Sequence, residues 1–270
     1  MKICNNEFLV WYNSVMKKFV LTILALVLLF TNTSVFAAQN VVKKDIATQV
    51  TDGFNMKATL MYPKNKTQKE FSTVVLLHSL GYNSQWWGAL PDELLSKGYA
   101  VLEIDLRGHG KSVYTSKLTK VSWKSMKNTA YAKYPDDVIK VIESVKNDNT
   151  RRAFFNNWAI VGSDIGASTG VLAADKYNVK PKTIVMISPV VKTRSLYIPV
   201  SIAQLDNVDF LSITGTDDAA SKESEDYLKK FAQNTFAEYT SESKTYGMLM
   251  LKNDPKLSKV IVEWIDQYFN

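Results

Sequence analysis

Cysteine is almost absent from this sequence, since Cys4 is the only one in 270 residues. A single cysteine excludes a disulfide bond within the chain and a metal site built from several thiolates. If the N-terminal segment that holds Cys4 is removed, no thiol is left for a lipid anchor. The remaining chain tolerates an oxidising compartment without using it to stabilise the fold.

Histidine is nearly as scarce, because the chain contains only His78 and His109. A serine nucleophile needs an adjacent base, and neutral imidazole is the usual one. Tyrosine, with an ordinary pKa near 10, is a poor base at neutral pH. Any histidine-dependent chemistry must therefore use one of these two residues. No sequence motif suggests a cofactor or a bound metal ion, and we expect neither.

Dense runs of one charge are also missing, although the net charge is +7. The lysines are spread along the chain without aromatic residues grouped beside them, so we expect a solvated surface and no nucleic-acid partner. The composition is 46% hydrophobic and 22% charged, which is typical of an ordinary globular domain. No internal repeat or low-complexity tract follows residue 40.

The N-terminal segment has the three parts of a secretory signal peptide. Met16-Lys17-Lys18 is followed by an apolar run over residues 19–30, and Val35-Phe36-Ala37 fits a cleavage site. We expect cleavage after Ala37 and a secreted or periplasmic protein. A membrane anchor is the alternative, but the apolar run is shorter than the roughly 20 residues that a span needs.

The signal peptide divides the chain into two parts. Residues 1–37 are predicted to be an N-terminal extension and the signal peptide, with Met16 as the true start, and residues 38–270 to be one domain. Removal of residues 1–37 takes away three lysines and one glutamate, which lowers the net charge from +7 to +5. No stable membrane anchor is expected after cleavage.

Short apolar runs and helical segments alternate along the domain, a pattern that indicates a mostly parallel sheet covered by helices on both faces. A hairpin around Asp52-Gly53 is expected to open the domain, with strands at 45–50 and 56–62. Further strands are predicted at 73–77, 100–104, 158–161, 183–187 and 210–214. Helices are predicted at 87–96, 136–145, 165–177, 221–233 and 255–268, the last one capped by Asp254.

Three motifs follow strands of this sheet, where such folds bind ligands. The first runs from Val74 to Gly81 and reads Val-Val-Leu-Leu-His-Ser-Leu-Gly. The second, residues 105–112, reads Asp-Leu-Arg-Gly-His-Gly-Lys-Ser, and the third, residues 160–167, contains Gly-Ser-Asp-Ile-Gly. Together they resemble the α/β-hydrolase family over residues 45–270, nearest to its dienelactone-hydrolase-like and serine-aminopeptidase-like members. The resemblance implies the α/β-hydrolase fold, here without room for a large lid.

The third motif stands where the family has its nucleophile elbow, Gly-x-Ser-x-Gly. Its central residue is Asp164 instead of serine. Ser163 comes one position early and Ser168 one helical turn late, so neither is expected at the tip of the elbow. One interpretation is that Asp164 caps the helix that begins at Ile165. The other is that Asp164 is itself a nucleophile, as in relatives that form an alkyl ester.

The resemblance also locates the other triad positions. Asp218 matches the family's acid, with Asp217 as the alternative, in the turn Gly-Thr-Asp-Asp. Tyr246 stands where a histidine is expected, in the loop that precedes the last helix. We expect the Tyr246 hydroxyl to donate a hydrogen bond to Asp164 or Asp218, because a phenol can donate and a carboxylate only accepts.

The remaining motif residues are assigned by the same resemblance. The oxyanion hole would be formed by the backbone N–H groups of Leu80 and Ile165, directed at a point above the elbow. His78 and His109 would form loop hydrogen bonds. Trp86 and Trp87 are expected to pack the first helix against the sheet, with ligand stacking as the alternative, and Arg107 is expected to tie its loop by hydrogen bonds.

The sequence thus leaves three functions open. The first is a secreted α/β-hydrolase homologue without Ser-His-Asp activity, which uses the cleft at Asp164 to bind a small molecule or a partner. The second is an active hydrolase of esters or related substrates with Asp164 as the nucleophile. The third is an interaction protein with no ligand in the cleft.

Overall fold

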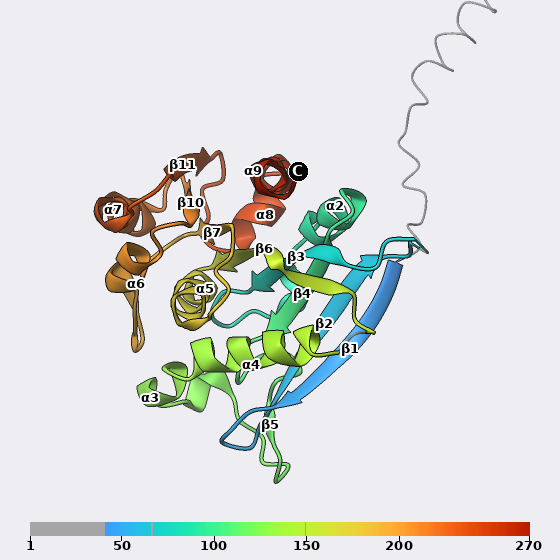
Figure 1. The fold of residues 1–270 in the computed structure, drawn as a ribbon. Coiled ribbons are helices and arrows are strands. Elements are labelled where there is room, and N and C mark those ends of the chain that lie inside the picture. The colour runs from blue at the N-terminus through green and yellow to red at the C-terminus, as the bar shows by residue number, and fades with distance from the viewer. Residues whose placement is uncertain (1–40, 66, 149) are drawn as a thin grey trace, which may run out of the picture. The chain divides into compact units, whose positions relative to one another are not determined.

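The computed structural model describes residues 41–65, 67–148 and 150–270, so the predicted signal peptide lies outside the described residues. The strands and helices follow each other in the alternating order that the sequence predicts (Figure 1). The strands are β1 (Val41–Gln49), β2 (Phe54–Pro63), β3 (Phe71–Leu77), β4 (Ala100–Asp105), β5 (Tyr114–Thr115), β6 (Ala153–Ser163), β7 (Thr183–Ile187), β8 (Lys192–Thr193), β9 (Leu196–Tyr197), β10 (Asp209–Gly215) and β11 (Phe236–Ser241).

The helices lie mostly between the parallel strands. They are η1 (Ser84–Trp86), α2 (Leu90–Ser96), η2 (Trp123–Ser125), α3 (Asn128–Tyr131), α4 (Tyr134–Lys146), α5 (Ile165–Lys176), α6 (Pro199–Gln204), α7 (Ala219–Leu228), η3 (Lys229–Phe231), α8 (Leu249–Asn253) and α9 (Leu257–Phe269). None of the helices in the described part of the chain is long and apolar enough to span a membrane.

The main sheet has the order β1-β2-β4-β3-β6-β7-β10-β11. The β1–β2 and β2–β4 pairs are antiparallel, and every following pair from β4–β3 to β10–β11 is parallel. The mostly parallel sheet and its helices confirm the predicted α/β-hydrolase fold. Because the carboxyl ends of β3, β6, β7 and β10 meet at one edge of the sheet, the motifs that follow these strands are brought together.

Two apolar cores enclose the sheet, one on each face, as parallel strands require. On one face the core includes side chains of α4, α5 and α7, such as Val138, Val171 and Leu228. On the other face it includes side chains of α2 and α9, such as Leu94 and Ile261. Figure 1 shows α4, α5, α6 and α7 on one side of the strands and α2 and α9 on the other. The sheet is therefore covered by apolar side chains on both faces.

Several predicted boundaries change by a few residues. The hairpin turn forms at Asp52-Gly53, where Gly53 has φ 76°, but both flanking strands are longer than expected. The helix expected at 87–96 begins at Leu90, because residues 84–86 form the separate turn η1. The last helix begins at Leu257, and Asp254 accepts a hydrogen bond from the Lys256 N–H without capping α9 directly.

Candidate active-site elbow

Asp164 forms the sharp turn between β6 and α5, with φ 52° and ψ −116°. A positive φ on a residue with a side chain is strained, and the neighbouring glycines make the turn possible. A Cβ atom on Gly166 would lie 1.9 Å from the Leu77 carbonyl oxygen, and one on Gly162 would lie 2.5 Å from the Ala167 Cα. The geometry is that of a nucleophile elbow with aspartate at its tip.

The Asp164 carboxylate turns toward the loop after β3. Its Oδ2 accepts a hydrogen bond from the Leu80 N–H at 3.2 Å, which is the contact expected of an oxyanion-hole donor. Burial raises the pKa of the Asp164 carboxyl, while the backbone N–H groups of Leu80 and Ile165 act in the opposite direction. The negative charge of Asp218 raises this pKa further, and the positive charge of Arg194 lowers it.

The helix-cap interpretation of Asp164 is only partly right. Asp164 is the N-cap residue of α5, and its backbone oxygen accepts hydrogen bonds from Ala167 and Ser168. Its side chain makes no capping hydrogen bond to the first turn, although the Ile165 N–H at the start of the helix lowers the pKa of the carboxyl. The carboxylate lies instead where the sequence resemblance places the oxyanion of the hydrolase reaction.

Asp218, the residue at the position of the triad acid, follows β10 and begins α7. Its Oδ1 accepts a hydrogen bond from the Ser221 N–H at 3.3 Å, so Asp218 caps α7. Its Oδ2 accepts a hydrogen bond from the Ser188 hydroxyl at 2.7 Å, and the Ser188 oxygen accepts one from the Gly247 N–H at 2.8 Å. Asp217, the alternative, is exposed.

The expected contact of Tyr246 is wrong. The Tyr246 side chain is 65% exposed, and its hydroxyl forms no hydrogen bond with Asp164 or Asp218, both of which the structure describes. The neighbouring Gly247 comes close to the elbow instead, since a Cβ atom there would lie 2.8 Å from the Ser79 Oγ. With φ 60°, Gly247 carries the loop past the elbow and leaves the tyrosine in solvent.

Both histidines are held in backbone hydrogen bonds. His78 Nε2 accepts from the Leu106 N–H at 2.9 Å, and His109 Nε2 accepts from the Gly81 N–H at 3.0 Å. The other ring nitrogen of each is 2.8 Å (His78) or 3.1 Å (His109) from a carbonyl oxygen. Burial lowers the pKa of each to about 4, so both imidazoles are neutral at pH 7. Neither has a free nitrogen to act as a base at the elbow.

The serines near the elbow are not activated either. Ser163 is fully buried, and its hydroxyl is 2.8 Å from that of Ser79. Ser168 is fully buried within α5 and has no hydrogen-bond partner among the described residues. A buried hydroxyl without a base beside it is a poor nucleophile.

Two residues at this site were not predicted. Ser188 follows β7, has φ 49° and links Asp218 to Gly247. Its position directly after the strand predicted at 183–187 could have marked it as a site residue, because such sheets bind ligands at the ends of their strands. Arg194 lies between β8 and β9, close enough to influence the Asp164 charge, and its guanidinium lies 5.3 Å from the centre of the Tyr131 ring. No sequence motif marks Arg194.

Other motif residues have structural contacts. Arg107 bonds Asp137 and Asp52 at 2.7–3.1 Å and ties its loop as predicted. Trp87 is buried in the core beside α2, which confirms the packing prediction. For Trp86 that prediction is wrong, since its side chain is 46% exposed and its ring meets the edge of Tyr82.

Comparison with known proteins agrees with this geometry. Solved structures with the same fold include an esterase from Exiguobacterium antarcticum, with a TM-score of 0.60 and 14% identity over 83% of this chain and 100% of that one. Another is a dienelactone hydrolase from Anabaena variabilis, with a TM-score of 0.63 and 13% identity over 86% of this chain and 100% of that one. No curated protein matches the sequence significantly.

The class of protein is therefore that of the α/β-hydrolases. Residues 68–234 match the model of the serine aminopeptidase family S33. The chain belongs to this family. The matched segment contains the elbow at Asp164 and the acid position at Asp218, whereas Tyr246 lies beyond it.

Proposed function

We propose that this chain is an exported member of the S33 family that binds a ligand at its elbow and does not hydrolyse esters or peptides by the usual triad. The observation that supports this most directly is the hydrogen bond from the Leu80 N–H to the Asp164 carboxylate. Acyl transfer needs such donors free for the oxyanion of the transition state. Here a carboxylate already engages one of them, and its negative charge would repel a second oxyanion.

The absence of an available base supports the same conclusion. His78 and His109 are the only histidines of the chain, and both lie in backbone hydrogen bonds. Without a free imidazole, the usual triad route to activating Ser163 or a water molecule at the elbow is closed. Loss of one triad member already costs several orders of magnitude in rate, and here both the serine and the histidine positions are changed.

A carboxylate at the elbow favours a ligand with N–H groups or a positive charge. An ionised carboxylate only accepts hydrogen bonds and has about four lone-pair sites. The Leu80 N–H occupies one of these sites. The remaining capacity suits an amine or ammonium group.

The proposal is tested with purified protein that begins at Ala38, the expected mature N-terminus. We expect no turnover above background on a panel of p-nitrophenyl esters, aminoacyl amides and haloalkanes. Saturation-transfer NMR with primary alkylammonium ions should show binding to the wild type and much less to Asp164→Asn. Turnover that Asp164→Ala abolishes would make Asp164 a catalytic residue and overturn the proposal.

An aspartate nucleophile is the second candidate, and the elbow conformation favours it. A non-glycine residue at φ 52° stores roughly 1–3 kcal/mol of strain. Such strain often marks a reacting group. In this reaction one Asp164 oxygen would bond to the alkyl carbon of a haloalkane while the halide leaves with the bonding electrons.

The two candidates are separated by mass spectrometry. An Asp164 nucleophile without a histidine to activate water would accumulate the alkyl ester. The peptide that contains Asp164 would then gain the mass of the alkyl group after incubation with haloalkanes. We expect no such adduct, and its detection would favour the second candidate.

A further inference from the structure

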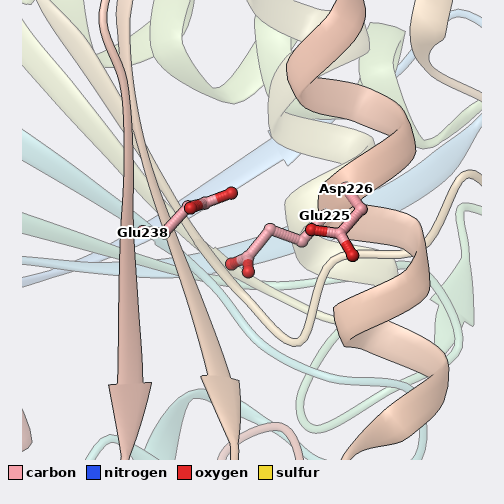
Figure 2. Close-up of side chains that lie close together, drawn as sticks. All are labelled: Glu225, Asp226 and Glu238. Carbon is pink, nitrogen blue, oxygen red and sulfur yellow. The ribbon is translucent and has the colours of Figure 1, made fainter.

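Three carboxylates lie together on α7 and β11, away from the elbow. They belong to Glu225 and Asp226 of α7 and to Glu238 of β11, and one oxygen from each lies within 4.8 Å of the others. Figure 2 shows the Glu225 side chain extending from the helix toward the strand that carries Glu238. Acidic side chains on a surface are common, so this cluster alone defines no site.

Glu225 is unusual among these carboxylates because it is buried. Its side chain is only 1% exposed. One of its oxygens, Oε1, accepts a hydrogen bond from the ammonium of Lys222, but Oε2 has no hydrogen-bond partner among the described residues. A buried carboxylate oxygen without a partner is costly, and such atoms often indicate an ion or water that satisfies them.

Two buried hydroxyls beneath α7 are an independent observation. Ser212 and Thr214 of β10 are at most 1% exposed, and neither hydroxyl has a hydrogen-bond partner in the described part of the chain. Ser212 pairs in register with Glu238 on the adjacent strand. In parallel strands, residues in register project on the same face of the sheet.

The position of Phe210 identifies that face. Phe210 is two residues before Ser212, so both project on one side of β10. It packs in the same apolar core as Leu228 of α7. Ser212 and Thr214 therefore face α7. Glu238 projects on the same side of the sheet, where its carboxylate pairs with the Lys229 ammonium at 3.3 Å. Buried oxygens without a hydrogen-bond partner among the described residues thus lie on α7, at Glu225, and on β10, the strand that pairs with β11.

We propose that Glu225, Asp226 and Glu238 form a binding site for a divalent cation, with Ca²⁺ as the preferred ion. Ca²⁺ binds oxygen ligands at about 2.3–2.6 Å, so two ligands on opposite sides of the ion are about 4.6–5.2 Å apart. The 4.8 Å limit on the three oxygens is compatible with one shared ion. Ser212, in register with Glu238 on the adjacent strand, lies on the same face of the sheet.

Two lysines occupy the neighbourhood of the site and would compete with the cation. Lys222 pairs with Glu225, and Lys229 pairs with Glu238. Their side chains are 46% and 52% exposed, so each ammonium can turn into solvent when an ion binds. Bound Ca²⁺ would join α7 to the edge strand β11 and hold the helix that Asp218 begins.

The test is a Ca²⁺ titration of the mature protein after treatment with a chelator, at constant ionic strength. We expect a saturable rise in the unfolding temperature and a matching heat in isothermal titration calorimetry, because an ion that binds only the folded state stabilises it. Mg²⁺ at the same concentration should raise the unfolding temperature less. Asp226→Asn and Glu238→Gln, both at exposed positions, should each weaken Ca²⁺ binding at least tenfold.

Glu223→Gln is the matched control, because it removes the same charge from the exposed face of α7 and Glu223 is not one of the three clustered carboxylates. It should bind Ca²⁺ as the wild type does. Lys222→Met removes a competing cation, so this variant should bind Ca²⁺ more tightly than the wild type. Bound Ca²⁺ should also restore the unfolding temperature that the variant loses with the Lys222–Glu225 ion pair. A Ca²⁺ effect that is absent, or that Glu223→Gln reduces as much as Glu238→Gln, would overturn the proposal.

Discussion

At the scale of single residues, the environment of Asp164 combines a burial cost with backbone N–H donors that act against it. Burial disfavours the charged carboxylate, and the Leu80 N–H partly offsets this cost. The pKa in the folded state is raised above the unfolded value, so the folded protein binds more protons between these two values. The contribution of Asp164 to stability therefore decreases as the pH rises through that window.

Asp164→Asn should consequently stabilise the protein at pH 7. The amide keeps an oxygen that can accept from the Leu80 N–H but carries no charge to bury. A gain of about 1 kcal/mol would raise the Tm by roughly 2–4 °C. The gain should shrink as the pH falls through the raised pKa of Asp164, because the carboxyl itself then becomes neutral. Calorimetry at pH 7 and pH 4 checks this, and a lower Tm for Asp164→Asn at pH 7 would contradict it.

The residues of the elbow were predictable to different degrees. Gly162 and Gly166 are required by backbone contacts that every such turn makes, so the motif fixes the location of Asp164. The orientation of Tyr246 depends on the φ of 60° at Gly247 and on the Ser79 and Ser163 hydroxyls beside it. These contacts join segments far apart in the sequence, and no local pattern contains them.

At the scale of secondary-structure elements, Arg107 joins three parts of the fold. Its guanidinium binds Asp137 of α4 and Asp52 of the β1–β2 turn, and it lies 4.4 Å from the centre of the Phe54 ring. Burial alone would raise the pKa of Asp52, but hydrogen bonds from Arg107 and Lys133 hold it well below its usual range. The charges are therefore mutually satisfied although Arg107 and Asp137 are buried.

Arg107→Met should destabilise the fold by roughly 3–5 kcal/mol, because it leaves Asp137 buried without a counter-charge. The double variant Arg107→Met with Asp137→Leu should recover much of that loss, since it removes both buried charges. Urea unfolding of the two variants and the wild type measures the difference. Equal loss in the single and double variants would show that packing of the arginine, and not its pairing, stabilises this corner.

Elements were predicted best where a buried apolar run defines them. The strand β7 at Thr183–Ile187 has the predicted bounds because all five of its residues are buried. The edge strand β11 received no predicted range, since its exposed and half-buried residues alternate and include Glu238 and Thr240. Such an edge resembles a polar loop in sequence, and only its parallel pairing with β10 reveals it.

At the scale of the whole molecule, both histidines are neutral at pH 7 and connect loops through backbone hydrogen bonds. Their pKa values of about 4 lie below the ordinary value of 6.5, because burial disfavours the charged ring. The unfolded chain therefore binds more protons between pH 6.5 and pH 4. The stability contributed by these residues is complete above pH 6.5 and is lost as the pH falls through that range.

The pH dependence can be followed directly because the chain has only two histidines. We expect both imidazole signals in NMR spectra of the folded protein to keep their neutral shifts at pH 5.5. The free energy of unfolding should fall between pH 6.5 and pH 4. An imidazole that titrates near pH 6.5 in the folded state would show that one of the buried ring contacts is not maintained.

The central strand β3 pairs on one side with β6, which comes much later in the chain. The hydroxyls that meet at the ends of these strands, those of Ser79 and Ser163, are 84 residues apart in sequence. Pairing of such distant segments slows folding, because a long loop must close before the contacts form. The middle of the sheet cannot assemble until β6 has been synthesised. Residues 71–77 therefore lack one of their two neighbouring strands until the chain has been made as far as residue 163.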